Sequence, residues 1–221
     1  MGKIAFVGDI HGFVEHLEKV NQQLFDEGIV EVMIQVGDLG IYPNIMPVLK
    51  QMEFPLPIYF IDGNHEAFNL LFGMIDKDND VTEIVPNLFY VKRGSILTLA
   101  DKKIAFIGGA ASVDKAWRTS GYDWFPEEIP TDEDFAKLNG VTDIDYFVSH
   151  TAPQSIIERN FPAENLVRYW NLPRSWKDST AVRLEETWKN MGRPEMFCGH
   201  MHCHIEDSGC TILNINEVLI K

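Results

Sequence analysis

The feature that most constrains this chain is a repeated pattern in which a short apolar run ends in a cluster of polar residues. Residues 57–61 are almost entirely apolar, as in a buried strand, and the sequence Asp-Gly-Asn-His-Glu at residues 62–66 follows at once. A folded core excludes such polar side chains unless each has a partner or a ligand. In open α/β sheets, ligand-binding residues lie just beyond the carboxyl ends of the strands. The pattern therefore predicts a binding site at one edge of a sheet.

The same pattern occurs at four more places along the chain. Residues 4–7, 32–36, 146–149 and 196–198 are largely apolar, and each run leads directly into a polar cluster. Carboxylate, imidazole and amide side chains are ligands for divalent metals. A metal centre is therefore predicted where the five clusters meet. Its candidate ligands are Asp9, His11, Asp38, Asn64, His150, His200 and His202.

The spacing inside two clusters indicates how these ligands are shared. Asp9 and His11 are two positions apart, and residues at i and i+2 of an extended chain point to the same side. His200 and His202 have the same spacing. The members of each pair are thus expected to share one side of the chain, and Asp9 and His11 to reach one cation. Asp38 carries two carboxylate oxygens and can bridge two cations.

Five short motifs follow one another between residues 8 and 202. They are Asp9-Ile10-His11, Gly37-Asp38, Gly63-Asn64-His65-Glu66, His150 and Gly199-His200-Met201-His202. In this order they resemble the calcineurin-like metallophosphoesterase superfamily. The resemblance implies an α/β fold, in which a sandwich of two mixed β-sheets is flanked by α-helices and the motif loops share one edge. It also implies a metal-dependent phosphoric ester hydrolase.

The resemblance further implies a partition of the ligands and a mechanism. One metal ion takes Asp9, His11, Asp38 and His202, and the other takes Asp38, Asn64, His150 and His200. A hydroxide bridging the two cations would attack phosphorus in line, with Asp38 as the shared ligand. His65 is implied to act as the general acid that protonates the leaving alkoxide. Mixed nitrogen and oxygen ligands suit Mn, Fe or Zn, of which we favour Mn.

One segment departs from part of the superfamily. Its protein phosphatases carry an Asp and an Arg shortly after the second motif, whereas Asp38 is followed here by Leu-Gly-Ile-Tyr-Pro at residues 39–43. We therefore expect hydrolysis of phosphomonoesters or small phosphodiesters, nucleotides among them, and a phosphoprotein substrate is less favoured. Two alternatives stay open: a serine/threonine protein phosphatase, and a non-catalytic metal-binding scaffold of the same fold. Because every expected ligand position is filled, the enzyme is favoured over the scaffold.

Arg118 is the candidate for holding the substrate phosphate. It follows the strand predicted at residues 103–107 and the glycine pair that ends it, which places it at the same edge of the sheet as the metal ligands. A guanidinium matches a phosphate with two parallel hydrogen bonds.

Two aromatic segments, residues 113–130 and 160–178, are the only sizeable stretches not used for the sheets or the metal motifs. Both are expected to reach over the metals. Trp124 or Tyr169 would then lie against a base or another apolar group, an arrangement that favours a compact ligand.

The formal net charge of −14 over 221 residues limits the partners. A long nucleic-acid groove needs a basic stripe, so no long nucleic acid is expected. No apolar run approaches the ~20 residues that span a membrane, and no membrane partner is expected. Cys198, Cys203 and Cys210 are an odd number of cysteines, which favours reduced thiols and a cytoplasmic location. Since the motifs run from end to end without a linker, we expect one domain over residues 1–221.

Local patterns predict several further elements. Residues 131–134 have the sequence of a capping box at the start of a helix. Residues 87–91 and 95–99 are expected to pair as a hairpin. A strand at residues 210–215 is expected near the end of the chain, with residues 217–220 as its partner. Repeated strand–helix pairs with interspersed hairpins predict an α/β fold with mixed sheets.

Overall fold

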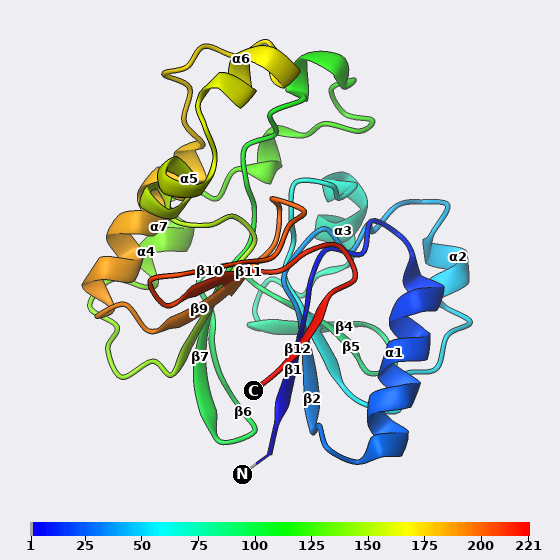
Figure 1. Cartoon of the computed structure of the whole chain (residues 1–221). Helices are drawn as coiled ribbons and strands as arrows, with labels where there is room; N and C mark the ends of the chain where they lie inside the picture. Colours follow the sequence, from blue (N-terminus) through cyan, green and yellow to red (C-terminus); the bar gives the residue numbers. More distant parts are fainter. Residues whose placement is uncertain (1) are drawn as a thin grey trace.

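The apolar runs of the sequence form two six-stranded sheets in the computed structural model, which describes residues 2–221 (Figure 1). The first sheet contains β1 (Ile4–Val7), β2 (Val32–Gln35), β3 (Ile58–Phe60), β4 (Val81–Val85), β5 (Leu88–Val91) and β12 (Val218–Ile220). The second contains β6 (Ile96–Leu99), β7 (Lys102–Ile107), β8 (Tyr146–Ser149), β9 (Glu195–Cys198), β10 (Ile205–Asp207) and β11 (Cys210–Ile212). Their strand orders are β12-β1-β2-β3-β5-β4 and β10-β11-β9-β8-β7-β6.

Parallel pairing at the centre of each sheet brings the polar clusters together. β1, β2 and β3 are parallel neighbours, with Ala5 opposite Met33 and Met33 opposite Ile58. β7, β8 and β9 are likewise parallel. Antiparallel strands occur at the margins, so both sheets are mixed, as the sequence predicts. Because parallel strands end at the same edge, the clusters that follow β1, β2 and β3 meet there.

Helices cover the outer face of each sheet (Figure 1). On the first sheet lie α1 (Val14–Glu27), α2 (Met46–Leu49) and α3 (Phe68–Met74). On the second lie α4 (Asp132–Ala136), α5 (Gln154–Asn160) and α7 (Ser179–Asn190). The capping box at the start of α4 is present, since the side chains of Thr131 and Asp134 each bind the backbone of the other. This architecture confirms the predicted sandwich.

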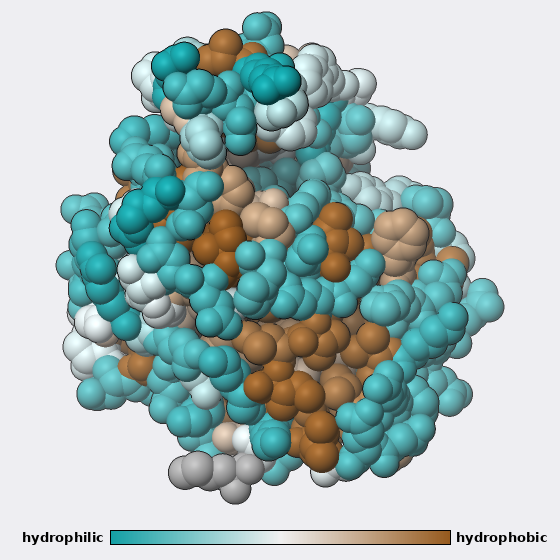
Figure 2. Space-filling model, in the orientation of Figure 1, coloured by the Kyte–Doolittle hydropathy of each residue, from teal (hydrophilic) through white to brown (hydrophobic). Residues whose placement is uncertain are grey.

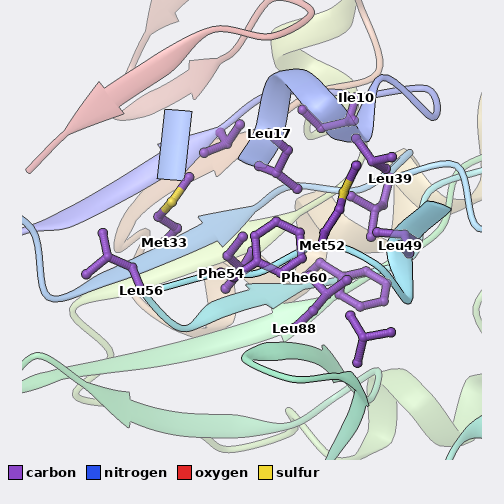
Figure 3. Close-up of a cluster of buried hydrophobic side chains, with 14 of the residues drawn as sticks. Ile10, Leu17, Met33, Leu39, Leu49, Met52, Phe54, Leu56, Phe60 and Leu88 are labelled. Atoms are coloured by element: carbon purple, nitrogen blue, oxygen red, sulfur yellow. The ribbon is translucent and has the colours of Figure 1, made fainter. Parts of the chain in front are cut away.

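Three apolar layers hold the sandwich together, because successive side chains of a strand point to opposite faces. In β1, Ala5 and Val7 face the helices, in the cluster drawn in Figure 3, whereas Ile4 and Phe6 face the other sheet. Between the sheets, the Phe6 ring stacks on Phe197, with ring centroids 3.8 Å apart. The third layer lies between the second sheet and its helices.

The predicted hairpin is wrong, although both of its strands form. β5 pairs with β3 and β4 in the first sheet, and β6 pairs with β7 in the second. Each strand contributes apolar side chains to the layer between the sheets, Val91 from β5 and Leu97 from β6, so the connection crosses that layer instead of folding back. Residues 217–220 are also misassigned, because β12 pairs with β1 and not with residues 210–215.

Residues 160–178 contain a helix that the sequence does not predict, α6 (Glu164–Trp170). It forms a lobe together with the 3₁₀ turn at Lys115–Trp117, and the lobe stands above the sheets with a hollow beneath it (Figures 1 and 2). The rings of Trp117 and Trp170 join the two segments, with centroids 5.6 Å apart. No helix within residues 2–221 is long and apolar enough to cross a membrane.

Candidate metal centre and the cleft above it

Four of the predicted ligands form a first group at the edge of the sandwich. Asp9, His11, Asp38 and His202 each offer one ligand atom, and these atoms all lie within 4.8 Å of one another. The Nε2 atoms of His11 and His202 are 2.9 Å apart, and they lie 3.7 and 3.2 Å from Asp9 Oδ2. Both carboxylates are fully buried. The lone pairs of this group therefore converge on one point.

A second group shares Asp38 with the first. Asp38, His150 and His200 offer ligand atoms within 4.8 Å of one another. Asn64 joins them, because its Oδ1 lies 3.1 Å from His150 Nε2. His150 Nδ1 donates to the backbone oxygen of Val36 at 3.0 Å, which turns Nε2 toward the group. The structure thus brings all seven predicted ligands together in two adjoining groups.

The backbone that positions these ligands is turned, not extended. His11, Asp38, His200 and His202 have φ values of 49°, 55°, 66° and 51°, in the left-handed region that costs energy for residues other than glycine. The predicted proximity of Asp9 and His11 therefore arises from a turn and not from strand alternation. His200 and His202 lie in different groups, and the predicted sharing of one side is wrong for them. Backbone bonds from Ile10 and His11 to Asp38 O, at 3.0 and 2.8 Å, hold the first turn in place.

Glycines beside the ligands give the neighbouring carboxylates room. A Cβ on Gly63 would overlap Asp38 Oδ1, and a Cβ on Gly199 would overlap Asp9 Oδ1. Neither glycine has a positive φ, so space and not backbone freedom accounts for them. Each glycine lets a carboxylate that follows another strand lie directly against the backbone, β2 for Gly63 and β1 of the other sheet for Gly199.

The electrostatics of the paired groups fit a bound cation. Burial lowers the pKa of His150, but the Asp38 carboxylate beside it outweighs burial and raises that pKa to about 10. Burial raises the pKa of Asp38, but the His150 charge outweighs it and holds that pKa well below its usual range. Asp38 Oδ2 is buried without a hydrogen-bond partner among residues 2–221. A divalent cation would replace the His150 proton and bind this free oxygen, so the residues present fit a metal centre.

A chain of hydrogen bonds orients the Asn64 amide. Ser112 Oγ lies 2.5 Å from Glu128 Oε2, and the Ser112 N–H donates to Glu128 Oε1 at 2.9 Å. An ionised carboxylate only accepts, so the single hydroxyl proton points at Glu128 and Ser112 Oγ accepts from Asn64 Nδ2 at 3.0 Å. The amide nitrogen of Asn64 is therefore directed away from the metal groups and Oδ1 toward them.

His65 and Arg118 lie against the second group. The backbone N–H of His65 donates to Asp38 Oδ1 at 2.7 Å, and Arg118 Nη2 lies 2.5 Å from the imidazole Nε2 of His65. A guanidinium only donates, so Nε2 accepts in this state. Burial lowers the pKa of His65, the Asp38 carboxylate opposes that shift and Arg118 adds to it. Arg118 is also paired with Asp114 at 2.8 Å.

A cleft of about 930 Å³ opens above these groups. Asp38, Asn64, His65 and Arg118 form part of its lining, and most of the remainder comes from residues 113–130 and 160–178. Tyr169 belongs to the lining, as the sequence predicts. Trp124 does not, because its ring packs under the ammonium group of Lys115, 3.9 Å away.

The comparisons with known proteins agree with this geometry. The sequence pattern of the calcineurin-like phosphoesterase family matches residues 2–204. The chain belongs to that family. It is thus a metal-dependent phosphoric ester hydrolase. No curated protein matches this phosphoesterase.

Two solved structures resemble this phosphoesterase at low sequence identity. A novel archaeal phosphodiesterase is 14% identical over 96% of this chain and 82% of its own, with a TM-score of 0.44. The TT1561 protein of Thermus thermophilus is 12% identical over 100% of this chain and 98% of its own, with a TM-score of 0.54. The second likeness supports the fold.

Ser112 and Glu128 are missing from the residues that the sequence singles out. Ser112 follows the end of β7 in the same way as the metal motifs follow their strands, and this position is the signal that could have identified it. Glu128 lies in the 3₁₀ turn Pro126–Glu128, within the first of the two inserted segments (residues 113–130 and 160–178), and has no comparable signal.

Asp178 lines the cleft and gives a testable dependence of stability on pH. Burial raises its pKa to about 6, despite hydrogen bonds from the Thr180 and Ala111 N–H groups. The native state therefore keeps a proton that the unfolded chain loses near pH 4, and ionisation costs stability as the pH rises from about 4 to 6. Asp178 is the N-cap of α7, and Asp178→Asn keeps this cap and removes the cost of ionisation. We expect the unfolding free energy of the variant, relative to the original protein, to rise by roughly 2–3 kcal/mol between pH 4 and pH 8.

Urea unfolding at the two pH values measures this difference, in which ionisations common to both proteins cancel. Asp132→Asn is the matched control, because its side chain is 91% exposed. A relative stability of Asp178→Asn that is flat with pH would contradict the assignment.

Proposed function

We propose that this phosphoesterase hydrolyses phosphomonoesters or small phosphodiesters with two divalent cations. The observation that carries the proposal is the sharing of Asp38 by two adjoining donor groups at the floor of a cleft. Asp9, His11, Asp38 and His202 would hold the first cation, and Asp38, Asn64, His150 and His200 would hold the second. Mixed nitrogen and oxygen ligands suit Mn, Fe or Zn, and we favour Mn.

Two such cations supply a nucleophile from water at neutral pH and neutralise the charge of the phosphoryl oxygens. The chain's own residues place and protonate the substrate. His65 donates a proton to the leaving oxygen, and its position beside the second group supports this role. Arg118 holds the substrate phosphate, to which a guanidinium binds with two parallel hydrogen bonds. Because Arg118 occupies His65 Nε2 in the free protein, its transfer to the phosphate frees that nitrogen to take up the proton that it then gives to the leaving oxygen.

The substrate is a compact ester in this proposal, not a folded phosphoprotein. The lobe stands over the metal groups and encloses a cleft of about 930 Å³, which suits a small molecule. The net charge of −14 opposes long nucleic acids. Cys198, Cys203 and Cys210 are free thiols, which favours a reducing compartment such as the cytoplasm.

A substrate screen tests this proposal. Hydrolysis is measured with Mn²⁺ at fixed ionic strength on p-nitrophenyl phosphate, its bis ester, nucleotides, cyclic nucleotides, phosphopeptides and short DNA. We expect the small esters to give the highest kcat/KM. Phosphopeptides better than every small ester by more than about tenfold, or ~1.4 kcal/mol in the transition state, would overturn the proposal.

Replacing His65 and Asp38 should separate proton donation from metal binding. His65→Ala is expected to keep its metals and to lower kcat by about 10²–10⁴-fold, with the larger loss for poor leaving groups. Asp38→Asn is expected to weaken both metals, because it removes charge from the shared ligand. Metal content per chain and kcat are measured for each variant. His16→Ala, on the exposed face of α1, is the control and should change neither quantity. The roles are reversed if His65→Ala loses its metals and Asp38→Asn keeps them.

Ser112→Ala tests the orientation of Asn64. It removes the oxygen that holds the Asn64 amide nitrogen, so Oδ1 is no longer directed at the second group. Groups that orient a metal ligand are typically worth about 10–100-fold in metal affinity. We expect a loss of this size for one Mn²⁺ and little change for the other, measured by metal titration. Ser155→Ala, whose hydroxyl donates to Glu185 at 2.6 Å and not to a predicted metal ligand, should leave both affinities unchanged. If Ser112→Ala weakens the binding of both metals equally, the proposed orientation of Asn64 by Ser112 is contradicted.

A further inference from the structure

The lobe side of the cleft is lined by aromatic rings that the metal chemistry does not require. Trp117 comes from the first inserted segment, and Phe161, Tyr169, Trp170 and Trp176 come from the second. We propose that this surface is a nucleobase subsite, in which the rings stack on the planar base of a nucleoside phosphate whose phosphate lies at the metal centre. The inference rests on the proposed function and specifies its substrate class.

Two of these rings are exposed to an unusual degree for their type. Trp117 is 63% exposed and Tyr169 is 55% exposed. Trp117 is held by Trp170, whose ring plane is inclined by 35° to its own, so one indole face is supported and much of the remaining surface is free. Exposed apolar surface that lines a cleft marks a ligand site. A base that stacks on this surface would cover it.

Two residues that line the cleft each carry a buried acceptor oxygen without a hydrogen-bond partner in the part of the chain that the structure describes. Gln154 and Asp178 both line it, and Gln154 Oε1 and Asp178 Oδ2 are buried without a hydrogen-bond partner among residues 2–221. The amide nitrogen of Gln154 is already used, because it donates to Glu158 at 3.1 Å. Buried acceptors of this kind cost stability until a donor reaches them. A ligand that reaches these oxygens is therefore expected to carry hydrogen-bond donors, either N–H or O–H.

Aromatic walls and unpaired acceptors together select among ligand classes. An acyl chain would cover the rings but would leave Gln154 and Asp178 without donors. A bare sugar phosphate would supply donors but would leave most of the aromatic surface open. A base with an exocyclic amino group presents two π-faces and N–H donors on its edge, and stacking on aromatic side chains is a general mode of base recognition.

Comparing two ligands with the same phosphate isolates the base. Adenosine 5′-monophosphate and ribose 5-phosphate differ only in the adenine, and their affinities are measured by calorimetry on Mn²⁺-loaded, full-length His65→Ala protein at pH 8. We expect adenosine 5′-monophosphate to bind about tenfold more tightly or better. Adding Trp117→Ala should remove most of this preference and leave ribose 5-phosphate unchanged, whereas Trp117→Phe should retain much of it. Tyr169→Ala is a second, independent variant in case Trp117→Ala fails to fold.

Tyr122→Ala is the matched control, because Tyr122 lies in the same inserted segment, is 78% exposed and does not line the cleft. It should leave both affinities unchanged. Equal affinities for the two ligands overturn the inference. A second result also overturns it: Trp117→Ala weakens binding of octyl phosphate but does not weaken binding of adenosine 5′-monophosphate. Hydrolysis of p-nitrophenyl phosphate and of its bis ester by the original protein is measured separately. The absence of both activities, with nucleotide binding that still depends on Trp117, would remove the proposed function and leave the subsite standing.

Discussion

The burial of two carboxylates against a ring of imidazoles is the constraint on which the rest of this structure depends. Asp9 and Asp38 have no exposed surface, and an isolated buried carboxylate is too costly to keep. Each therefore lies among backbone N–H groups and imidazoles that offset its charge: His200 N–H donates to Asp9 at 3.1 and 3.2 Å, and His65 N–H donates to Asp38. Such contacts are possible only where several chain segments end together, which is at the carboxyl edge of parallel strands.

The site is also assembled from both sheets. Asp9, Asp38 and Asn64 follow strands of the first sheet, whereas His150 and the His200 motif follow strands of the second. The apolar layer between the sheets, which includes the stacked Phe6 and Phe197 rings, therefore sets the distance between the two halves of the donor set. Close packing of that layer leaves little freedom for the halves to separate.

The ligand residues were accessible from the sequence because their chemistry requires particular residue types at strand ends. Strand partners were not, since an apolar run at residues 95–99 fits either sheet equally well until the layer between the sheets is packed. The turns at His11 and His202 were missed because the motif spacing is compatible with both an extended and a left-handed backbone. α6 escaped detection for another reason: none of its residues is buried, so it has no apolar stripe for a pattern to reveal.

The two inserted segments are held tightly near the metal site and loosely in the outer part of the lobe. Near the sheets, the first segment is tightly held: Arg93 binds Asp62 at 2.6 Å and the Glu127 carbonyl at 2.7 Å, while Glu128 binds Ser112 behind Asn64. Further out, α6 buries no residue, and its Arg174–Glu164 ion pair is exposed, where such pairs contribute little. Local stability thus falls from the metal centre toward the lobe. Substitutions in the outer lobe can therefore alter what the cleft accepts without displacing the ligands beneath it, which allows one metal centre to serve different ester substrates.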